Sequence, residues 1–188
     1  MTDAAKAPFA YDRRTIILHW LTAIMVGLLW LLGQSIGYMP RGTFRIDARS
    51  VHIMLGLLLG FLVLARLYWR KRGSGALRPE RSGLLDHLAD IGHIVLYALL
   101  VLVVALGIAN VSVRPNYLFD LVQLPPLWPG DRGLRQFISA AHAYAANTLA
   151  IIALLHALMA LFHHHVLRDG VLTRMLPPKR SQGHVPAE

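Results

Sequence analysis

The chain has 188 residues, of which 55% are hydrophobic, and its formal net charge is +9. It contains no cysteine, which excludes disulfides, thiolate-ligated haem, iron–sulfur clusters and the covalent attachment of c-type haem. The positive charge does not indicate nucleic-acid binding, because the basic residues flank long apolar runs in the way that membrane topology requires.

Four apolar runs are each long enough to cross about 30 Å of hydrocarbon, which takes roughly 20 helical residues. They cover approximately residues 15–38, 51–68, 88–111 and 137–163. The first run is too long for a cleavable signal peptide, lacks a small-residue cleavage site and contains His19 and Trp20. The sequence therefore predicts an all-α membrane protein, a four-transmembrane-helix bundle that forms one domain over residues 1–188.

The basic residues are distributed unevenly between the two sides of this bundle. Thirteen of the nineteen Lys and Arg residues lie on the side that carries both termini. Because cytoplasmic loops are enriched in Lys and Arg, both termini are predicted to be cytoplasmic. The six on the other, outer side are Arg41, Arg45, Arg49, Arg114, Arg132 and Arg135.

Four histidines lie within the apolar runs, where ionisable side chains are rare and usually mark a functional site. His142 and His156 are fourteen residues apart on the last run, so they project from one helix face about 21 Å apart in depth. Helix direction places His52 near the outer surface and His19 near the inner one. The predicted pairs are therefore His52 with His142, and His19 with His156.

Two imidazoles at equal depth on facing helices can ligate one haem iron from both sides. The sequence thus predicts two b-type haems, one near each membrane surface. Swapping either pair would require ligands about 20 Å apart in depth. Each histidine taken alone is ambiguous, and a purely structural membrane protein whose histidines are packing residues is one alternative.

Two further residues near the inner surface are weaker candidates. Arg66 lies fourteen residues after His52 and either extends to the interface or pairs with a haem propionate. His93 either competes with His19 as a ligand, serves a quinone or proton site, or simply packs. The sequence does not locate a quinone. The histidines at 163–165 are expected to be surface residues.

Three connections and one glycine pair complete the predicted organisation. Residues 41–50 are predicted to form an outer loop, and residues 112–135 a longer outer connection that folds over the surface as a lid. Residues 73–82, which are basic and rich in Gly and Pro, are predicted to form an inner loop. Gly56 and Gly60 are expected to let a neighbouring helix or a flat ring approach the backbone.

These features together resemble the bacterial cytochrome b561 family of small four-helix dihaem cytochromes, over nearly the whole chain. The segments that carry the resemblance are ILHW at 17–20, VHIMLG at 51–56, GHIVLY at 92–97, LHA at 155–157 and RDGVLTRMLP at 168–177. The resemblance implies location in the bacterial inner membrane and haem ligands at His19, His52, His142 and His156. One departure is Asp90, where family members often have a histidine.

The resemblance also implies an activity, the oxidation of superoxide at the periplasmic face with transfer of the electron to ubiquinone. In this sequence the outer arginines would attract the anion, as a basic funnel formed by Arg41, Arg45, Arg49 and Arg135. The alternative for these arginines is binding of membrane lipid phosphates. The alternative for the protein is a non-catalytic cytochrome b subunit between a periplasmic redox protein and the quinone pool.

Overall fold

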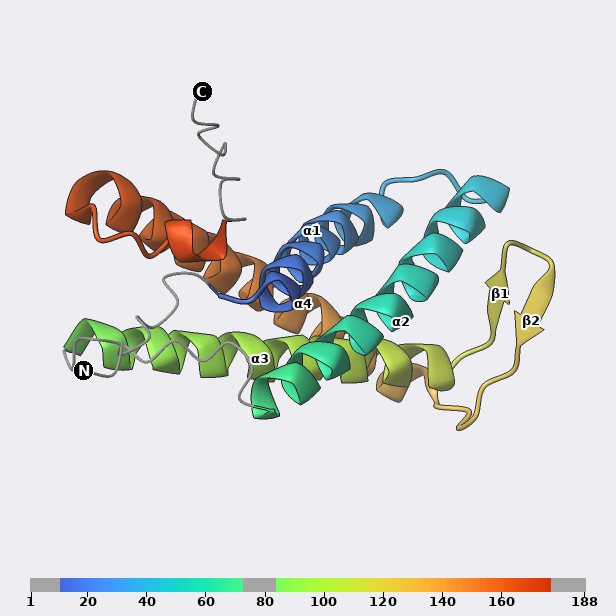
Figure 1. The fold of residues 1–188 in the computed structure, drawn as a ribbon. Coiled ribbons are helices and arrows are strands. Elements are labelled where there is room, and N and C mark those ends of the chain that lie inside the picture. The colour runs from blue at the N-terminus through green and yellow to red at the C-terminus, as the bar shows by residue number, and fades with distance from the viewer. Residues whose placement is uncertain (1–10, 73–83, 177–188) are drawn as a thin grey trace, which may run out of the picture.

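The structure, a computed structural model, describes residues 11–72 and 84–176, so the inner loop predicted at residues 73–82 lies outside the described residues. Four helices in this part of the chain are long and apolar enough to cross a membrane, which confirms the predicted fold class. They are α1 (Arg13–Ile36), α2 (Thr43–Lys71), α3 (Leu84–Ser112) and α4 (Arg132–Phe162). Figure 1 shows them in chain order from blue to red.

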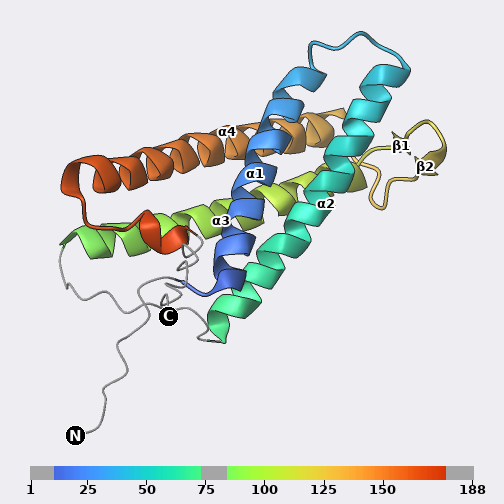
Figure 2. The same cartoon turned by 45° about the horizontal axis from the view of Figure 1, so that its top comes forward.

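The four helices are arranged as two antiparallel hairpins. α1 and α2 form one hairpin, and α3 and α4 form the other. The two helices within each hairpin pack together more extensively than the two hairpins pack on each other. The hairpins cross at a clear angle, so that α2 contacts α3 and α1 contacts α4 (Figure 2). α4 therefore has neighbours in both hairpins, which matters because it carries two of the histidines.

α2 begins at Thr43, well before the apolar run that starts at residue 51. The prediction of a loop over residues 41–50 was therefore wrong for all but its first two positions. Hydropathy reports only the part of a helix that lies in hydrocarbon, and this helix continues beyond it with polar residues. The remaining connection to α1 includes Gly42, whose φ of +138° favours glycine.

The outer connection between α3 and α4 contains a small antiparallel sheet of β1 (Asn116–Leu118) and β2 (Val122–Leu124). The buried side chain of Ser50 fixes this sheet to α2. Its Oγ accepts a hydrogen bond from the backbone N–H of Phe119 at 2.8 Å and lies 3.3 Å from the carbonyl oxygen of Tyr117. The segment predicted as a lid is thus attached beside the outer end of α2 (Figure 1).

The core of the bundle is an apolar cluster to which every transmembrane helix contributes. Leu149 lies seven residues from both His142 and His156, so this cluster lies between the depths of the two histidine pairs. Gly60 lets α3 approach α2, because an added Cβ would lie 3.2 Å from Val104 Cγ1. Gly56 makes no such contact. The buried members of the cluster are Leu29, Leu59, Val63, Leu100 and Leu149.

The inner end is held together by contacts between segments far apart in sequence. Asp12 caps α1 and accepts a hydrogen bond from the indole N–H of Trp69 on α2, at 3.3 Å. The indole N–H of Trp20 donates to the carbonyl oxygen of Met175 at 2.9 Å. Both ends of the described chain therefore lie on one side of the bundle.

Replacing Asp12 by alanine should destabilise the protein by about 1 kcal/mol, the usual effect of removing a helix N-cap. Burial alone would raise the pKa of Asp12, but the hydrogen bonds from Thr15, Trp69 and Arg14 hold it below its ordinary 3.8. The carboxylate's contribution should therefore be complete at neutral pH and be lost as the pH falls through that lowered value.

Thermal unfolding in detergent, followed by circular dichroism between pH 3 and 7, measures this effect. Asp47→Ala is the control, since this carboxylate is exposed on α2 and makes no hydrogen bond with the described residues. Equal melting temperatures for the two variants at pH 7 would contradict the prediction.

Candidate functional site

The two outer histidines face each other across the bundle. The rings of His52 on α2 and His142 on α4 have centroids 6.2 Å apart and planes inclined at 84°. Each ring lies against a glycine of the neighbouring helix. An added Cβ would lie 3.2 Å from His52 Cε1 at Gly33 on α1, and 3.3 Å from His142 Cε1 at Gly107 on α3. These two glycines were not among the predicted site residues.

The ring nitrogens of the outer pair differ in their partners. His142 Nδ1 lies 3.1 Å from the carbonyl oxygen of Val103, to which the Nδ1–H tautomer donates a hydrogen bond. This leaves Nε2 with its lone pair, the arrangement that histidine ligands of metals usually show. His52 Nδ1 is buried and has no hydrogen-bond partner among the described residues.

Three histidine rings meet near the inner surface. The centroids of His19 and His156 are 6.4 Å apart, and those of His93 and His156 are 5.4 Å apart. Arg66 Nη2 lies 3.4 Å from His19 Nδ1. The guanidinium of Arg66 also lies over the ring of Tyr97 at 5.1 Å. The structure therefore brings all the inner candidates together.

Ring separations test whether the pairs suit a haem iron. An imidazole–metal bond of about 2 Å on each side of one iron places two ring centroids about 6 Å apart. The separations of 6.2 Å for His52–His142 and 6.4 Å for His19–His156 agree with this value. His93 and His156, at 5.4 Å, agree less well. The residues present at both depths fit a bis-histidine haem.

No group of three or more His, Cys, Asp or Glu side chains suited to a metal ion occurs in residues 11–72 and 84–176. A metal site of the zinc type would need such convergence. The paired histidines are an arrangement in the described part of the chain that could hold the iron of a haem.

Three outer arginines gather on the outer side of His52 and His142. Burial, together with the nearby charges of Arg49 and Arg135, lowers the pKa of Arg114. Arg114 donates hydrogen bonds to the carbonyl oxygen of Arg135 at 2.9 Å and to Ser139 Oγ at 2.8 Å. We call Arg49, Arg114 and Arg135 the outer arginine cluster.

The outer arginine cluster differs from the predicted funnel. Arg45 instead donates to the carbonyl oxygen of Met39, and Arg41 is an exposed residue of the connection between α1 and α2. Arg114 was missed as a site residue, although it is the first charged residue after the third apolar run. Within the described residues no carboxylate forms an ion pair with the cluster.

A family model described as prokaryotic cytochrome b561 matches residues 10–178. The chain belongs to this family. Membership makes it a multi-pass membrane protein of the cytochrome b561 type, which binds haem b and transfers electrons.

Three curated relatives match along almost their whole length. A Yersinia pestis protein named probable superoxide oxidase CybB is 31% identical over 173 residues, covering 90% of this chain and 97% of the relative. Cytochrome b561 homolog 1 of Escherichia coli K12 is 26% identical over 173 residues, covering 90% and 98%. Cytochrome b562 of Cereibacter sphaeroides is 28% identical over 178 residues, covering 90% and 96%.

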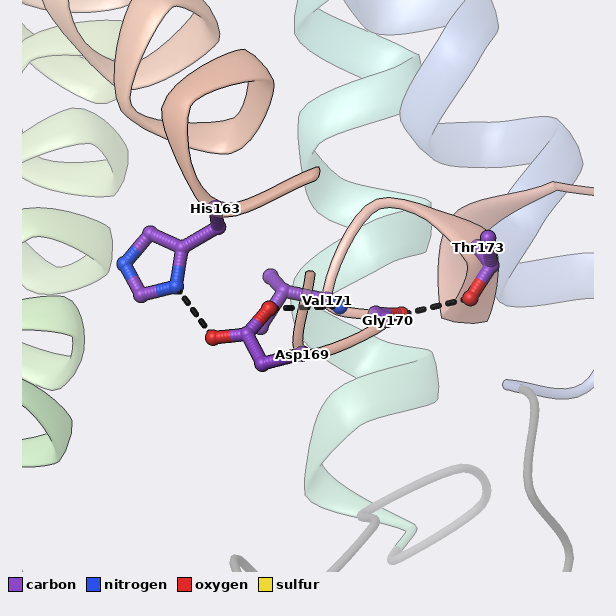
Figure 3. Close-up of polar contacts among 5 residues, drawn as sticks. All are labelled: His163, Asp169, Gly170, Val171 and Thr173. Atoms are coloured by element: carbon purple, nitrogen blue, oxygen red, sulfur yellow. Dashed lines mark hydrogen bonds and ion pairs between the residues drawn. The ribbon is translucent and has the colours of Figure 1, made fainter. Parts of the chain in front are cut away.

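The chain turns back after α4 through a bond between His163 and Asp169, drawn in Figure 3. His163 opens a π-helical turn (His163–Leu167), and the reversal follows at Arg168, whose φ is 53°. His163 Nδ1 lies 2.5 Å from Asp169 Oδ2. Its side chain is only 17% exposed, so the prediction of a plain surface residue was wrong for His163.

Asp169 accepts a second hydrogen bond, from the backbone N–H of Val171 at 3.2 Å (Figure 3). Burial alone would raise the pKa of Asp169, but the bonds from His163 and Val171 lower it. The reversal returns the chain to α1, where Trp20 donates to the carbonyl oxygen of Met175.

Replacing Gly107 by alanine should disturb the outer histidine pair selectively. The new Cβ would lie 3.3 Å from His142 Cε1, and the ring is held by its bond to Val103. Overpacking of this kind typically costs about 1–3 kcal/mol. In the predicted arrangement of two haems, a redox-titrated visible spectrum should show one haem shifted in potential or reduced in occupancy and the other unchanged.

Gly27→Ala is the matched control, because an added Cβ at this exposed α1 position meets no atom within 4 Å. Identical spectra for Gly107→Ala and Gly27→Ala would show that the close approach at Gly107 does not constrain the haem site.

Proposed function

We propose that the chain is a superoxide:ubiquinone oxidoreductase of the bacterial inner membrane. Two superoxide anions would each give one electron and leave as O₂, and one ubiquinone would take up both electrons and two protons to form ubiquinol. The observation that carries the proposal is the outer arginine cluster, a group of cations on the outer side of His52 and His142 in which Arg114 is bonded to the backbone of Arg135 and which forms no ion pair with a described carboxylate.

The four histidines are proposed as the axial ligands of two haem b groups. His52 and His142 would hold the outer haem, and His19 and His156 the inner one. A haem held by two imidazoles supplies one-electron oxidation and reduction of iron without an open position for a small ligand. The bond from His142 Nδ1 to Val103 fixes that ring, and Gly33 and Gly107 leave room for both outer rings.

Arg66 is proposed to pair with a propionate of the inner haem. Its guanidinium is partly buried beside His19 and Tyr97, and none of the described carboxylates pairs with it. A buried cation is costly unless an anion compensates it. His93, next to His156, remains the candidate for proton handling at this end.

The outer arginine cluster supports an anionic substrate by electrostatic steering. Fields from uncompensated charges raise the encounter rate of an opposite charge by about 10- to 1,000-fold. Asp131, the nearest of the outer acids in sequence, uses its carboxylate to cap α4 by accepting from Leu134 N–H at 2.8 Å. The Yersinia pestis relative named probable superoxide oxidase supports the same substrate.

The test uses the purified protein alone, with an enzymatic source of superoxide and decylubiquinone. Haem reduction and ubiquinol formation should both follow superoxide production. If superoxide reduces no haem but a periplasmic redox protein does, the chain is instead the non-catalytic electron-transfer subunit. Added salt should slow the superoxide reaction, because steering is screened.

A further inference from the structure

Three polar side chains meet within the membrane-spanning parts of α1 and α4. The indole N–H of Trp30 donates to Asn147 Oδ1 at 2.9 Å, and Gln34 Nε2 donates to the same oxygen at 2.8 Å. The chemistry described above uses none of these residues. We call Trp30, Gln34 and Asn147 the amide cluster.

The amide cluster keeps hydrogen-bonding capacity that the described chain does not use. Asn147 Oδ1 has two donors, but Asn147 Nδ2 and Gln34 Oε1 have no partner among the described residues. In hydrocarbon there is no water to take their place, and an unsatisfied polar group there is destabilising. Polar residues at this depth usually mark a site.

The cluster faces outward on the surface that lipid covers. Trp30 is 37% exposed and Gln34 is also exposed, so a molecule dissolved in the membrane can reach both. The flat indole ring offers an apolar face, and Asn147 Nδ2 offers N–H donors. This combination suits a flat, lipid-soluble ring that bears carbonyl acceptors.

The cluster also lies close to the proposed haem sites. Gly33, which packs against His52, immediately precedes Gln34. On α4, Asn147 is five residues from His142 and nine from His156, which correspond to roughly 7.5 and 13.5 Å along the helix axis. Asn147 thus lies at a depth between the two pairs, whereas Gln34 lies close to the depth of His52.

We propose that the amide cluster is the docking site of the quinone ring, with Asn147 Nδ2 donating to a quinone carbonyl oxygen and Trp30 contacting the ring face. The proposal rests on the proposed function, in which ubiquinone is the electron acceptor. It assigns a binding site to ubiquinone, the second substrate, which the sequence did not locate.

Photoaffinity labelling tests the site without relying on turnover. Purified protein in proteoliposomes is irradiated with an azido-ubiquinone, and the labelled peptides are mapped by mass spectrometry. Label should appear within residues 27–36 or 143–151, and excess decylubiquinone should remove it. Label confined to the surroundings of His93 or His163 would overturn the proposal.

Variants supply the second arm of the test. Asn147→Leu and Gln34→Leu should each raise the KM for decylubiquinone about fivefold to tenfold, the effect of losing a hydrogen bond, with kcat and haem spectra unchanged. Thr148→Val is the control, since Thr148 is exposed at the same depth and makes no hydrogen bond with the described residues.

Two results separate the remaining explanations. An altered haem spectrum in Trp30→Phe, with the KM for quinone unchanged, would make the cluster a structural tie between α1 and α4 and overturn the proposal. Specific labelling of the cluster without reduction of haem by superoxide would leave the quinone site standing and refute the superoxide activity instead.

Discussion

Replacing His156 by alanine should remove one haem from the protein and leave the other in place. In the proposed assignment this residue ligates only the inner haem, and the outer pair of His52 and His142 lies about 21 Å away along α4. The haem-to-protein ratio of the purified variant, measured by the pyridine haemochrome method, should fall from two to one. Its remaining spectrum should match that of the outer haem in the intact protein.

The complementary variant His142→Ala should lose the outer haem and keep the inner one. His165→Ala is the matched control, because it removes an exposed histidine from the π-helical turn that follows α4. Loss of both haems in His156→Ala would indicate that the bundle needs the cofactor to fold. Loss of neither, or retention of the inner haem in His19→Ala with His93 as its ligand, would refute the pairing.

Neutralising the outer arginine cluster should have the second large effect. The triple variant of Arg49, Arg114 and Arg135 to glutamine should lower the rate of haem reduction by superoxide at least tenfold at low ionic strength, since steering contributes about 10- to 1,000-fold. The residual rate should depend weakly on salt. Stopped-flow reduction at several salt concentrations measures both quantities.

Two single variants separate charge from structure in this prediction. Arg114→Lys keeps the charge and should retain most of the rate, whereas Arg114→Gln should lose part of it. Arg41→Gln is the comparison, because Arg41 is exposed in the connection between α1 and α2 and belongs to the predicted funnel but not to the cluster. An equal effect of Arg41→Gln and Arg114→Gln would favour general surface charge or lipid binding over a defined site.

The spans and the pairing of histidines were predictable from sequence because both depend on depth alone. Hydrocarbon thickness sets the length of an apolar run, and helix direction then sets the level of each residue. The structure brings His52 to His142 and His19 to His156 as predicted, although their role as ligands stays a prediction. His93 shares the inner depth, which is why sequence alone could not separate it from His19.

The site residues that were not predicted depend on how each helix is rotated about its own axis and on contacts between segments that are far apart in sequence. Gly33 and Gly107 matter only because their helices turn that side toward a histidine ring. Arg114 belongs to the cluster because the chain after α3 folds back toward Ser139. The loop at 41–50 was wrongly predicted because hydropathy marks only the part of a helix that lies in hydrocarbon, and here a polar helical segment continues beyond it.

The apolar cluster around Leu149 has an electrical consequence. It separates two sites about 21 Å apart in a layer about 30 Å thick, so an electron that passes between them crosses roughly two-thirds of the membrane voltage. In the proposed assignment each electron moved inward therefore does work of about 1.6 kcal/mol per 100 mV against a negative interior. The membrane potential should therefore shift the equilibrium distribution of an electron between the two proposed haems. A more negative interior should favour reduction of the outer haem over the inner one.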